Sequence, residues 1–159
     1  MANLVYLTLN GQLQGLISAG CSSQSSIGNK AQTGHADQIM VLGLTHGMTR
    51  QQNVNHQALT IAKPVDKSSP LLGKAINENE CLSCEFHFYR TNRAGMNECY
   101  YKLALINARI AGIHLQVPHT INDSEGQPEE SIEFTYESIS WEHCTAGTSG
   151  YSLWGERIL

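Results

Sequence analysis

The side chains of this chain that are able to do chemistry include five cysteines and seven histidines. The most suggestive spacing among them is Cys81-Leu82-Ser83-Cys84, because C-x-x-C pairs occur in zinc sites and redox-active dithiols. A structural zinc site needs two more ligands, and the sequence holds no second such pair. In a strand, residues three apart point to opposite faces, so the two sulfurs diverge. We therefore predict no metal site and no cofactor.

The same residues do not form a recognisable catalytic motif. No nucleophile stands in a G-x-S-x-G elbow, no H-E-x-x-H pair is present, and no glycine-rich phosphate loop follows a strand. His143-Cys144, and Cys84 with His87, are neighbours only in the sequence. An odd number of cysteines in a chain of this length favours reduced thiols. The sequence thus predicts a protein that is not an enzyme and has no catalytic residue.

Length and composition indicate one folded domain over residues 1–159. A chain of 159 residues buries roughly 70% of the surface that its unfolded form exposes. No apolar run approaches the roughly 20 residues of a membrane helix, so we expect no membrane insertion. The first 19 residues contain no Lys or Arg, and Asn10-Gly11-Gln12 interrupts their apolar run. We expect no cleaved signal peptide, and any export would use another route.

Charged residues are distributed unevenly along the chain. The net charge of -4 argues against a nucleic-acid binder, which would carry a basic face. Eight of the ten basic residues lie between Arg50 and Arg109, whereas half of the acidic residues lie in residues 123–142. This acidic stretch is either a solvated face or the part of a charge-asymmetric subunit that meets the basic part of a neighbour, which would favour head-to-tail packing.

The elements that must position these residues are mostly strands. Asn10-Gly11 predicts a tight hairpin turn after the first strand. In the strand over residues 38–49, Leu42 and Leu44 are expected to point into the core, and Gly43 and Thr45 away from it. Polar composition predicts loops over residues 18–36, 50–57 and 122–130. Period-two alternation predicts strands over residues 5–9, 12–17, 38–49, 58–65, 80–91, 98–117, 131–144 and 151–154.

One short α-helix is predicted within this series of strands. Ser69 is expected to cap it, and Pro70 to take its first position, where a missing N–H costs nothing. The helix would lie against the sheet through one apolar stripe. That stripe consists of Leu71, Leu72, Ala75 and Ile76.

Two predicted strands depart from one-sided alternation. Residues 100–110 are apolar on both faces, which indicates either a buried central strand or a second face that meets a neighbouring subunit. In residues 131–141 the apolar parity switches after Tyr136, which predicts a bulge or a barrel corner. A single helix among eight to ten such strands favours a mainly β fold, an antiparallel β-barrel of two packed sheets.

Four segments in order resemble the haemolysin-coregulated protein (Hcp) family of the bacterial type VI secretion system. They are residues 35–47, residues 63–72 with the pattern K-x-x-D-K-S-S-P-L-L, residues 100–110 and residues 133–141. The resemblance implies a structural tube protein that assembles as a homohexameric ring. Such rings stack into an inner tube within contractile sheath proteins and below a valine-glycine-repeat spike protein. Contraction would expel the tube, with secreted effectors in its lumen, from the bacterial cytoplasm.

The resemblance also implies two functional surfaces. Gly43 and Thr45 would face the lumen and contact effectors. The polar loop that reaches the adjacent ring would contain Arg50, Gln51, Gln52, Asn53 and Asn55. A monomeric β-barrel that binds a ligand or protein without ring assembly is the alternative function.

Overall fold

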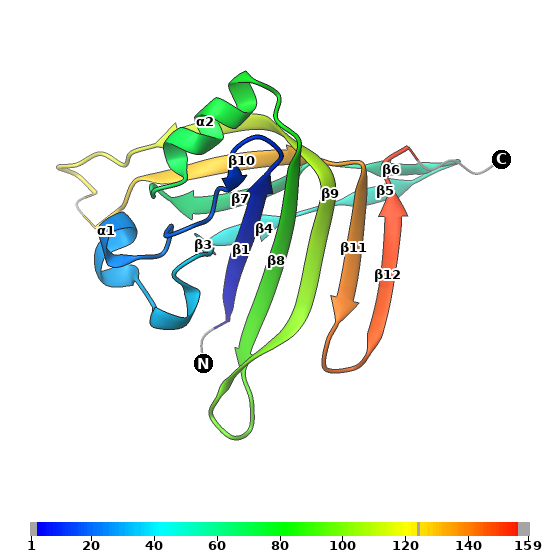
Figure 1. The fold of residues 1–159 in the computed structure, drawn as a ribbon, viewed down its shortest axis with the longest axis horizontal. Helices are drawn as coiled ribbons and strands as arrows, with labels where there is room; N and C mark the ends of the chain where they lie inside the picture. The colour runs from blue at the N-terminus through cyan, green and yellow to red at the C-terminus, as the bar shows by residue number, and fades with distance from the viewer. Residues whose placement is uncertain (1–2, 124, 156–159) are drawn as a thin grey trace.

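A computed structural model describes residues 3–123 and 125–155, and most of its regular structure is β (Figure 1). The helical segments are α1 (Gln24–Ile27), α2 (Ser69–Asn77) and 3₁₀ turns at Gly28–Lys30 and Thr33–His35. The strands are β1 (Leu4–Gly11), β2 (Gly15–Leu16), β3 (Ile39–Val41), β4 (Gly43–Thr45), β5 (Met48–Arg50), β6 (Val54–His56), β7 (Leu59–Pro64), β8 (Leu82–Thr91), β9 (Asn97–Gln116), β10 (Glu129–Thr135), β11 (Ser138–His143) and β12 (Thr148–Leu153).

Two antiparallel sheets share the long strand β9. The first half of β9 pairs with β8 and β11, and its last part pairs with β10. The main strand order is β2-β1-β8-β9-β10-β7-β4, with β3 on β1 and β12 on β11. The sheets pack face to face around one core, and α2 lies beside them (Figure 1). The predicted mainly β fold with two packed sheets and one short helix is confirmed.

Strand β9 changes its inward face at Asn107. Leu103 and Leu105 are buried before this residue, and Ala108 and Ile110 are buried after it. Asn107 has a φ of 51°, and the β8–β9 register shifts at the same place, as at a β-bulge. The two-sided apolar pattern therefore arises in part because one strand fills the core from successive faces. Ile106 points outward before this change and is 49% exposed, so a second face that meets a neighbouring subunit stays a prediction.

The parity switch predicted in residues 131–141 is a corner between β10 and β11. Phe134 is buried before the corner and Ile139 after it. β10 pairs with the end of β9, whereas β11 pairs with the beginning of β9. The chain thus passes from one sheet to the other at Tyr136 and Glu137, so this prediction is confirmed.

The N-terminal hairpin exists, but its turn is not at Asn10-Gly11. Both residues remain paired within β1, and the turn follows over residues 12–14. The turn is held by the buried Glu80, whose Oε2 accepts hydrogen bonds from the backbone N–H groups of Leu13 at 3.0 Å and Gln14 at 2.9 Å. A Cβ at Gly11 would collide with the same oxygen and press on the Ile17 side chain, so a larger residue there would displace the Glu80 carboxylate from the turn.

The single strand predicted over residues 38–49 is divided into β3, β4 and β5. Leu42 is exposed, contrary to the prediction, because the chain leaves β1 here and joins β7, where the Leu42 N–H donates to the Ala62 carbonyl at 2.7 Å. Leu44 packs against the core as predicted. The predicted polar loop at residues 50–57 is largely the hairpin β5–β6, and residues 18–36 contain α1 and two 3₁₀ turns.

Helix α2 begins where the sequence indicates, but not with the predicted cap. Ser68 takes the N-cap position, and Ser69 is the first helical residue. The Ser69 side chain instead bonds outside the helix, to Glu130. Pro70 lies in the first turn. Within the predicted stripe, Leu72 and Ala75 are buried and Leu71 packs partly against the core, whereas Ile76 lies at the edge of the stripe and is exposed.

Candidate functional site

Strands β4, β7, β10 and the end of β9 present one outer face of small and polar side chains. Gly43, on β4, has cross-strand neighbours in the order Ala62, Ser131, His114. Thr45 has neighbours in the order Thr60, Glu133, Gly112. The row between them turns to the core and consists of Leu44, Ile61, Ile132 and Ile113. Gly43 and Thr45 thus point away from the core, as predicted.

Short side chains keep this outer face shallow at Glu133. The Glu133 carboxylate lies over Gly112, where an added Cβ would come 3.4 Å from the carboxylate carbon. His114 Nε2 is 3.7 Å from Glu133 Oε1, and both side chains are substantially exposed. An exposed pair of this kind contributes at most about 1 kcal/mol to stability. The face is therefore open and shallow, and its shape does not suit the enclosure of a small ligand.

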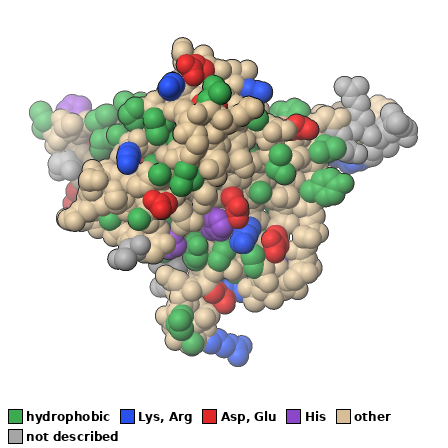
Figure 2. Space-filling model, viewed as in Figure 1, with side chains coloured by type: hydrophobic (Ala, Val, Ile, Leu, Met, Phe, Trp, Pro, Cys, Tyr) green, Lys and Arg blue, Asp and Glu red, His purple; other side chains and the backbone are tan. Residues whose placement is uncertain are grey.

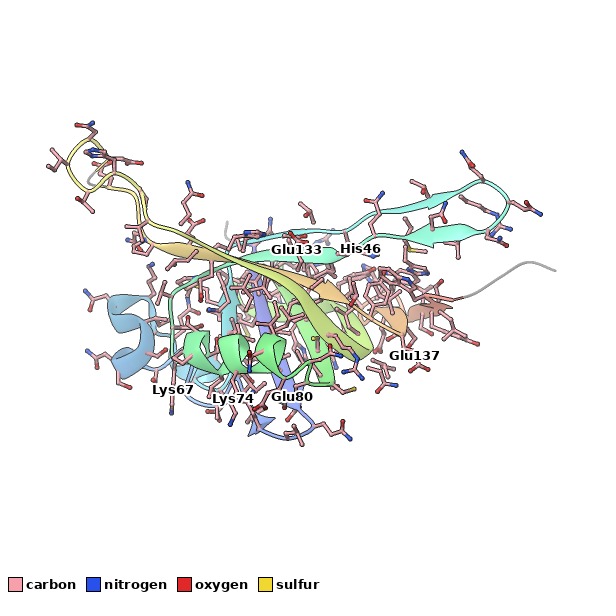
Figure 3. The ribbon with its side chains drawn as sticks, turned by 90° about the horizontal axis from the view of Figure 1, so that it is seen from above. His46, Lys67, Lys74, Glu80, Glu133 and Glu137 are labelled. Carbon is pink, nitrogen blue, oxygen red and sulfur yellow. The ribbon has the colours of Figure 1, made fainter. Side chains whose placement is uncertain are left out.

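The hairpin β5–β6 projects from one end of this face (Figure 3). Its strands pair only with each other among the described ladders, with Met48 opposite His56 and Arg50 opposite Val54. The five residues of the predicted stacking loop lie in this hairpin: Arg50, Gln51, Gln52, Asn53 and Asn55. Four of them are exposed and Asn53 is half-buried. The hairpin thus offers polar side chains well away from the core.

A cluster of aromatic and polar side chains lies at the base of the hairpin. The Tyr136 hydroxyl is 2.6 Å from His46 Nε2 and 2.8 Å from His56 Nδ1. His56 Nε2 is 2.9 Å from Ser152 Oγ, and its ring stacks on Trp154. We call these five residues the hairpin clasp. The sequence analysis missed it, because residues so far apart in the chain form no recognisable spacing.

Burial sets the proton affinities within the hairpin clasp. It lowers the pKa of His46, and the charge of His56 lowers that pKa further. Burial also lowers the pKa of His56, partly offset by a backbone hydrogen bond at Leu153. It raises the pKa of Tyr136 to about 12. Near neutral pH the clasp therefore consists of neutral groups, linked by hydrogen bonds.

A buried ion network holds the start of α2 to the sheet. Lys63 is fully buried, and its Nζ lies 2.8 Å from Glu130 Oε1 and 3.0 Å from Asp66 Oδ1. Asp66 Oδ1 also accepts bonds from the N–H of Ser68 at 2.9 Å and its hydroxyl at 2.5 Å. The Ser69 hydroxyl donates to Glu130. The K-x-x-D-K-S-S-P pattern thus supplies the network on one side, and β10 supplies its partner.

The basic and acidic stretches of the sequence pair with each other at one place inside the subunit. Lys63 comes from the basic stretch of the sequence and Glu130 from the acidic stretch, and they pair in the interior. On the face seen in Figure 2, acidic and basic side chains are interspersed. The uneven distribution along the sequence therefore does not translate into a single-signed patch on that face.

Two of the five thiols, those of Cys21 and Cys84, are buried in environments unsuited to nucleophilic chemistry. Burial raises the pKa of Cys84 strongly and that of Cys21 to about 11, so both stay protonated near neutral pH. Among residues 3–123 and 125–155, no group of three or more His, Cys, Asp or Glu side chains is placed to hold a metal ion. None of the helices in the same residues is both long and apolar enough to span a bilayer.

An open pocket of about 1030 Å³ lies between the ends of β1 and β8 and the β10–β11 corner. Its charged side chains already have partners. Arg109 donates to the Asn79 carbonyl, and Glu137 accepts a 2.5 Å bond from Asn107 Nδ2. The pocket therefore offers no free acid–base pair from these two residues.

Comparison with known proteins gives one consistent family. Residues 6–143 match the family model described as "Type VI secretion system effector, Hcp". The chain belongs to the Hcp family. The "Major exported protein" of Pseudomonas aeruginosa PAO1 is 38% identical over 97% of this chain and 96% of its own length. YhhZ of Escherichia coli K12, an uncharacterised protein, is 40% identical over 93% of this chain, which spans 37% of the length of YhhZ.

Solved Hcp structures have the same fold. The structure described as "Crystal structure of Hcp protein" superposes with a TM-score of 0.91 and 32% identity, covering 98% of this chain and 99% of that one. The secreted protein Hcp3 from Pseudomonas aeruginosa gives a TM-score of 0.88 and 37% identity, covering 98% and 100%. Hcp is a family of structural, secreted tube proteins, so this type VI secretion system protein is not an enzyme.

Proposed function

We propose that this protein is the inner-tube subunit of a type VI secretion system, acting as a single domain. Six copies form a ring, rings stack into a tube, and sheath contraction expels the tube with effectors in its lumen. The outer face of β4, β7, β10 and β9 carries this proposal, since its rows of small and polar side chains are in register across four strands. A continuous face of this kind is suited to lining a channel.

The proposed partners follow from the family rather than from any contact in the structure. They are other copies of the chain, the sheath proteins, the valine-glycine-repeat spike protein and secreted effectors. The subunit would fold in the bacterial cytoplasm and leave by the type VI system without a cleaved signal peptide. Nucleic acid and membrane insertion have no part in this function.

The hairpin β5–β6 is the proposed contact between stacked rings. The hairpin projects beyond the body of the subunit (Figure 3). A neighbouring subunit can therefore contact its polar side chains without touching the body. The contacting residues would be Arg50, Gln51, Gln52, Asn53 and Asn55.

Light scattering after size exclusion, combined with negative-stain images, tests the proposal. Six copies of the 17.5 kDa chain have a mass of about 105 kDa, and the images should show rings with an open centre. A stable monomer without rings at high protein concentration would refute ring assembly. That result would favour the alternative, a monomeric β-barrel that binds a ligand or protein.

A substitution at Thr45 tests the proposed lumen face. Thr45 is exposed and points away from the core, so Thr45→Arg should leave the rings intact. The long cation would project from the outer face and lower the amount of effector that co-purifies from the producing cell. Thr145→Arg, in the exposed turn after β11, is the matched control. Unchanged effector recovery with Thr45→Arg would exclude this position from effector contact.

A further inference from the structure

The hairpin clasp occupies the two points where the hairpin β5–β6 joins the body. His46 precedes β5 and His56 ends β6, whereas Tyr136 lies at the β10–β11 corner and Ser152 lies on β12. Figure 3 shows His46 where the hairpin leaves the body. The hairpin strands form a separate two-stranded sheet. At its base the Gln57 N–H donates to the Gly47 carbonyl at 3.1 Å, and the side-chain contacts of the clasp add to this backbone bond in holding the hairpin to the body.

The hydrogen bonds of the clasp are complete only for some protonation states. The Tyr136 hydroxyl has a single proton, which it donates to one imidazole while the other imidazole donates an N–H to its oxygen. Both histidines neutral, or one of them charged, satisfies this arrangement. When both are charged, His46 Nε2 and His56 Nδ1 both donate to Tyr136. The buried hydroxyl proton then loses both of its acceptors, and two cations face one oxygen.

Among the described residues, no carboxylate forms an ion pair with His46 or His56. Glu137, beside Tyr136, keeps its charge but accepts a hydrogen bond from Asn107, and Arg109 on β9 donates to the Asn79 carbonyl. Glu133 on β10 faces His114 across the outer face. Arg50 lies on β5 and adds positive charge to the hairpin. The charge on His46 is opposed by burial and by His56.

We propose that the hairpin clasp is a pH-sensitive latch, which holds β5–β6 in its projecting position near neutral pH and releases it in mildly acidic solution. Clasped histidines take up protons less readily than free ones, whose pKa is about 6.5. Protonation therefore favours release as the pH falls below that value. The role of the latch in ring stacking rests on the proposed tube function, but the release itself does not.

Hydrogen exchange of the full-length protein at pH 7.5 and pH 5.0 tests the latch, with each amide rate divided by its intrinsic rate at that pH. We expect exchange over residues 48–57 to rise severalfold at pH 5.0, including that of the Gln57 N–H, which donates to the Gly47 carbonyl at the base of the hairpin. Strands β8 and β9 serve as the internal reference. Exchange of the hairpin that does not change with pH would overturn the proposal.

Three variants separate the latch from other titrating groups. His46→Gln with His56→Gln should abolish the pH dependence, and Tyr136→Phe should give rapid hairpin exchange already at pH 7.5. His87→Gln is the control, because burial also lowers the pKa of His87 but it lies on β8. A pH dependence that disappears only in His87→Gln would overturn the latch.

Sedimentation of assembled tubes at the same two pH values distinguishes the two proposals. Hairpin release without tubes at any pH would support the latch and refute the tube function. Tubes that dissociate at pH 5.0 while the hairpin stays protected would overturn the latch but leave the tube function intact. Release accompanied by tube dissociation supports both.

Discussion

Replacing Lys63 with Met tests the buried ion network that joins α2 to β10. Met has a similar length but no charge, so the substitution removes the cation without leaving a large cavity. The side chains of Lys63, Asp66 and Glu130 are 0%, 1% and 9% exposed. Without Lys63, two largely buried carboxylates remain with no cation to pair with.

The expected loss is large compared with the total stability of a domain. Breaking a buried ion pair by removing one partner costs about 3–5 kcal/mol. The free energy of unfolding of a domain of this size is about 5–15 kcal/mol. At about 2–4 °C per kcal/mol, the thermal midpoint should fall by about 6–20 °C.

Denaturant unfolding at fixed protein concentration measures this loss. Lys67→Met is the matched control, because Lys67 belongs to the same segment but is exposed. The free energy of unfolding of this variant should stay within about 0.5 kcal/mol of wild type. The double variant Lys63→Met with Glu130→Leu should be more stable than Lys63→Met. It also removes the Glu130 carboxylate, which is left buried without a cation in the single variant. A Lys63→Met protein as stable as wild type would refute the reasoning.

Two further predictions concern the core and the N-terminal turn. Leu72→Asp should destabilise the subunit and so prevent stable ring formation, because it places a carboxylate at a buried position of α2. Unfolding curves measure the stability of the variant, and native gels measure its rings. Intact rings of normal stability would contradict this prediction. For Glu80, burial raises the pKa, but hydrogen bonds from Gln14 and Leu13 and the charge of Lys74 outweigh it, so the net pKa is lowered. Wild type should therefore exceed Glu80→Gln in unfolding free energy above the ordinary pKa of about 4.3, and the difference should shrink as the pH falls below it. A difference that stays constant from pH 7 to pH 3 would exclude this role of the carboxylate.

Local patterns predicted the elements better than the places where the chain changes partners. Alternation indicated β7 and β8, and the Pro70 segment indicated α2, because these signals lie within a few consecutive residues. The exposure of Leu42 follows from a change of partner strand, from β1 to β7. The inward faces of β9 depend on the conformation of Asn107. The change of partner strand at Leu42 leaves no mark on the hydrophobic pattern, whereas the change of face in β9 appears there only as apolar residues on both faces, which two structures could explain.

Side-chain contacts between distant segments were the least predictable part of the site. The N-terminal turn depends on Glu80, which is far from it in the sequence. Ser69 was expected to cap α2, as a serine before a proline does, but the charged pair nearby offers its hydroxyl a stronger partner. The signal for this network was present, since Lys63 follows Leu59 and Ile61 at the buried spacing of β7.

The buried network gives the segment over residues 63–72 a physical role in the proposed assembly. Lys63 and Glu130 are direct cross-strand partners of β7 and β10, so their ion pair fixes the register of these strands. The same register places Thr60 beside Glu133 on the outer face and Ile61 beside Ile132 in the core. A slip by one residue would exchange the two faces. The segment that starts α2 therefore stabilises the arrangement of the outer face without contributing a side chain to it.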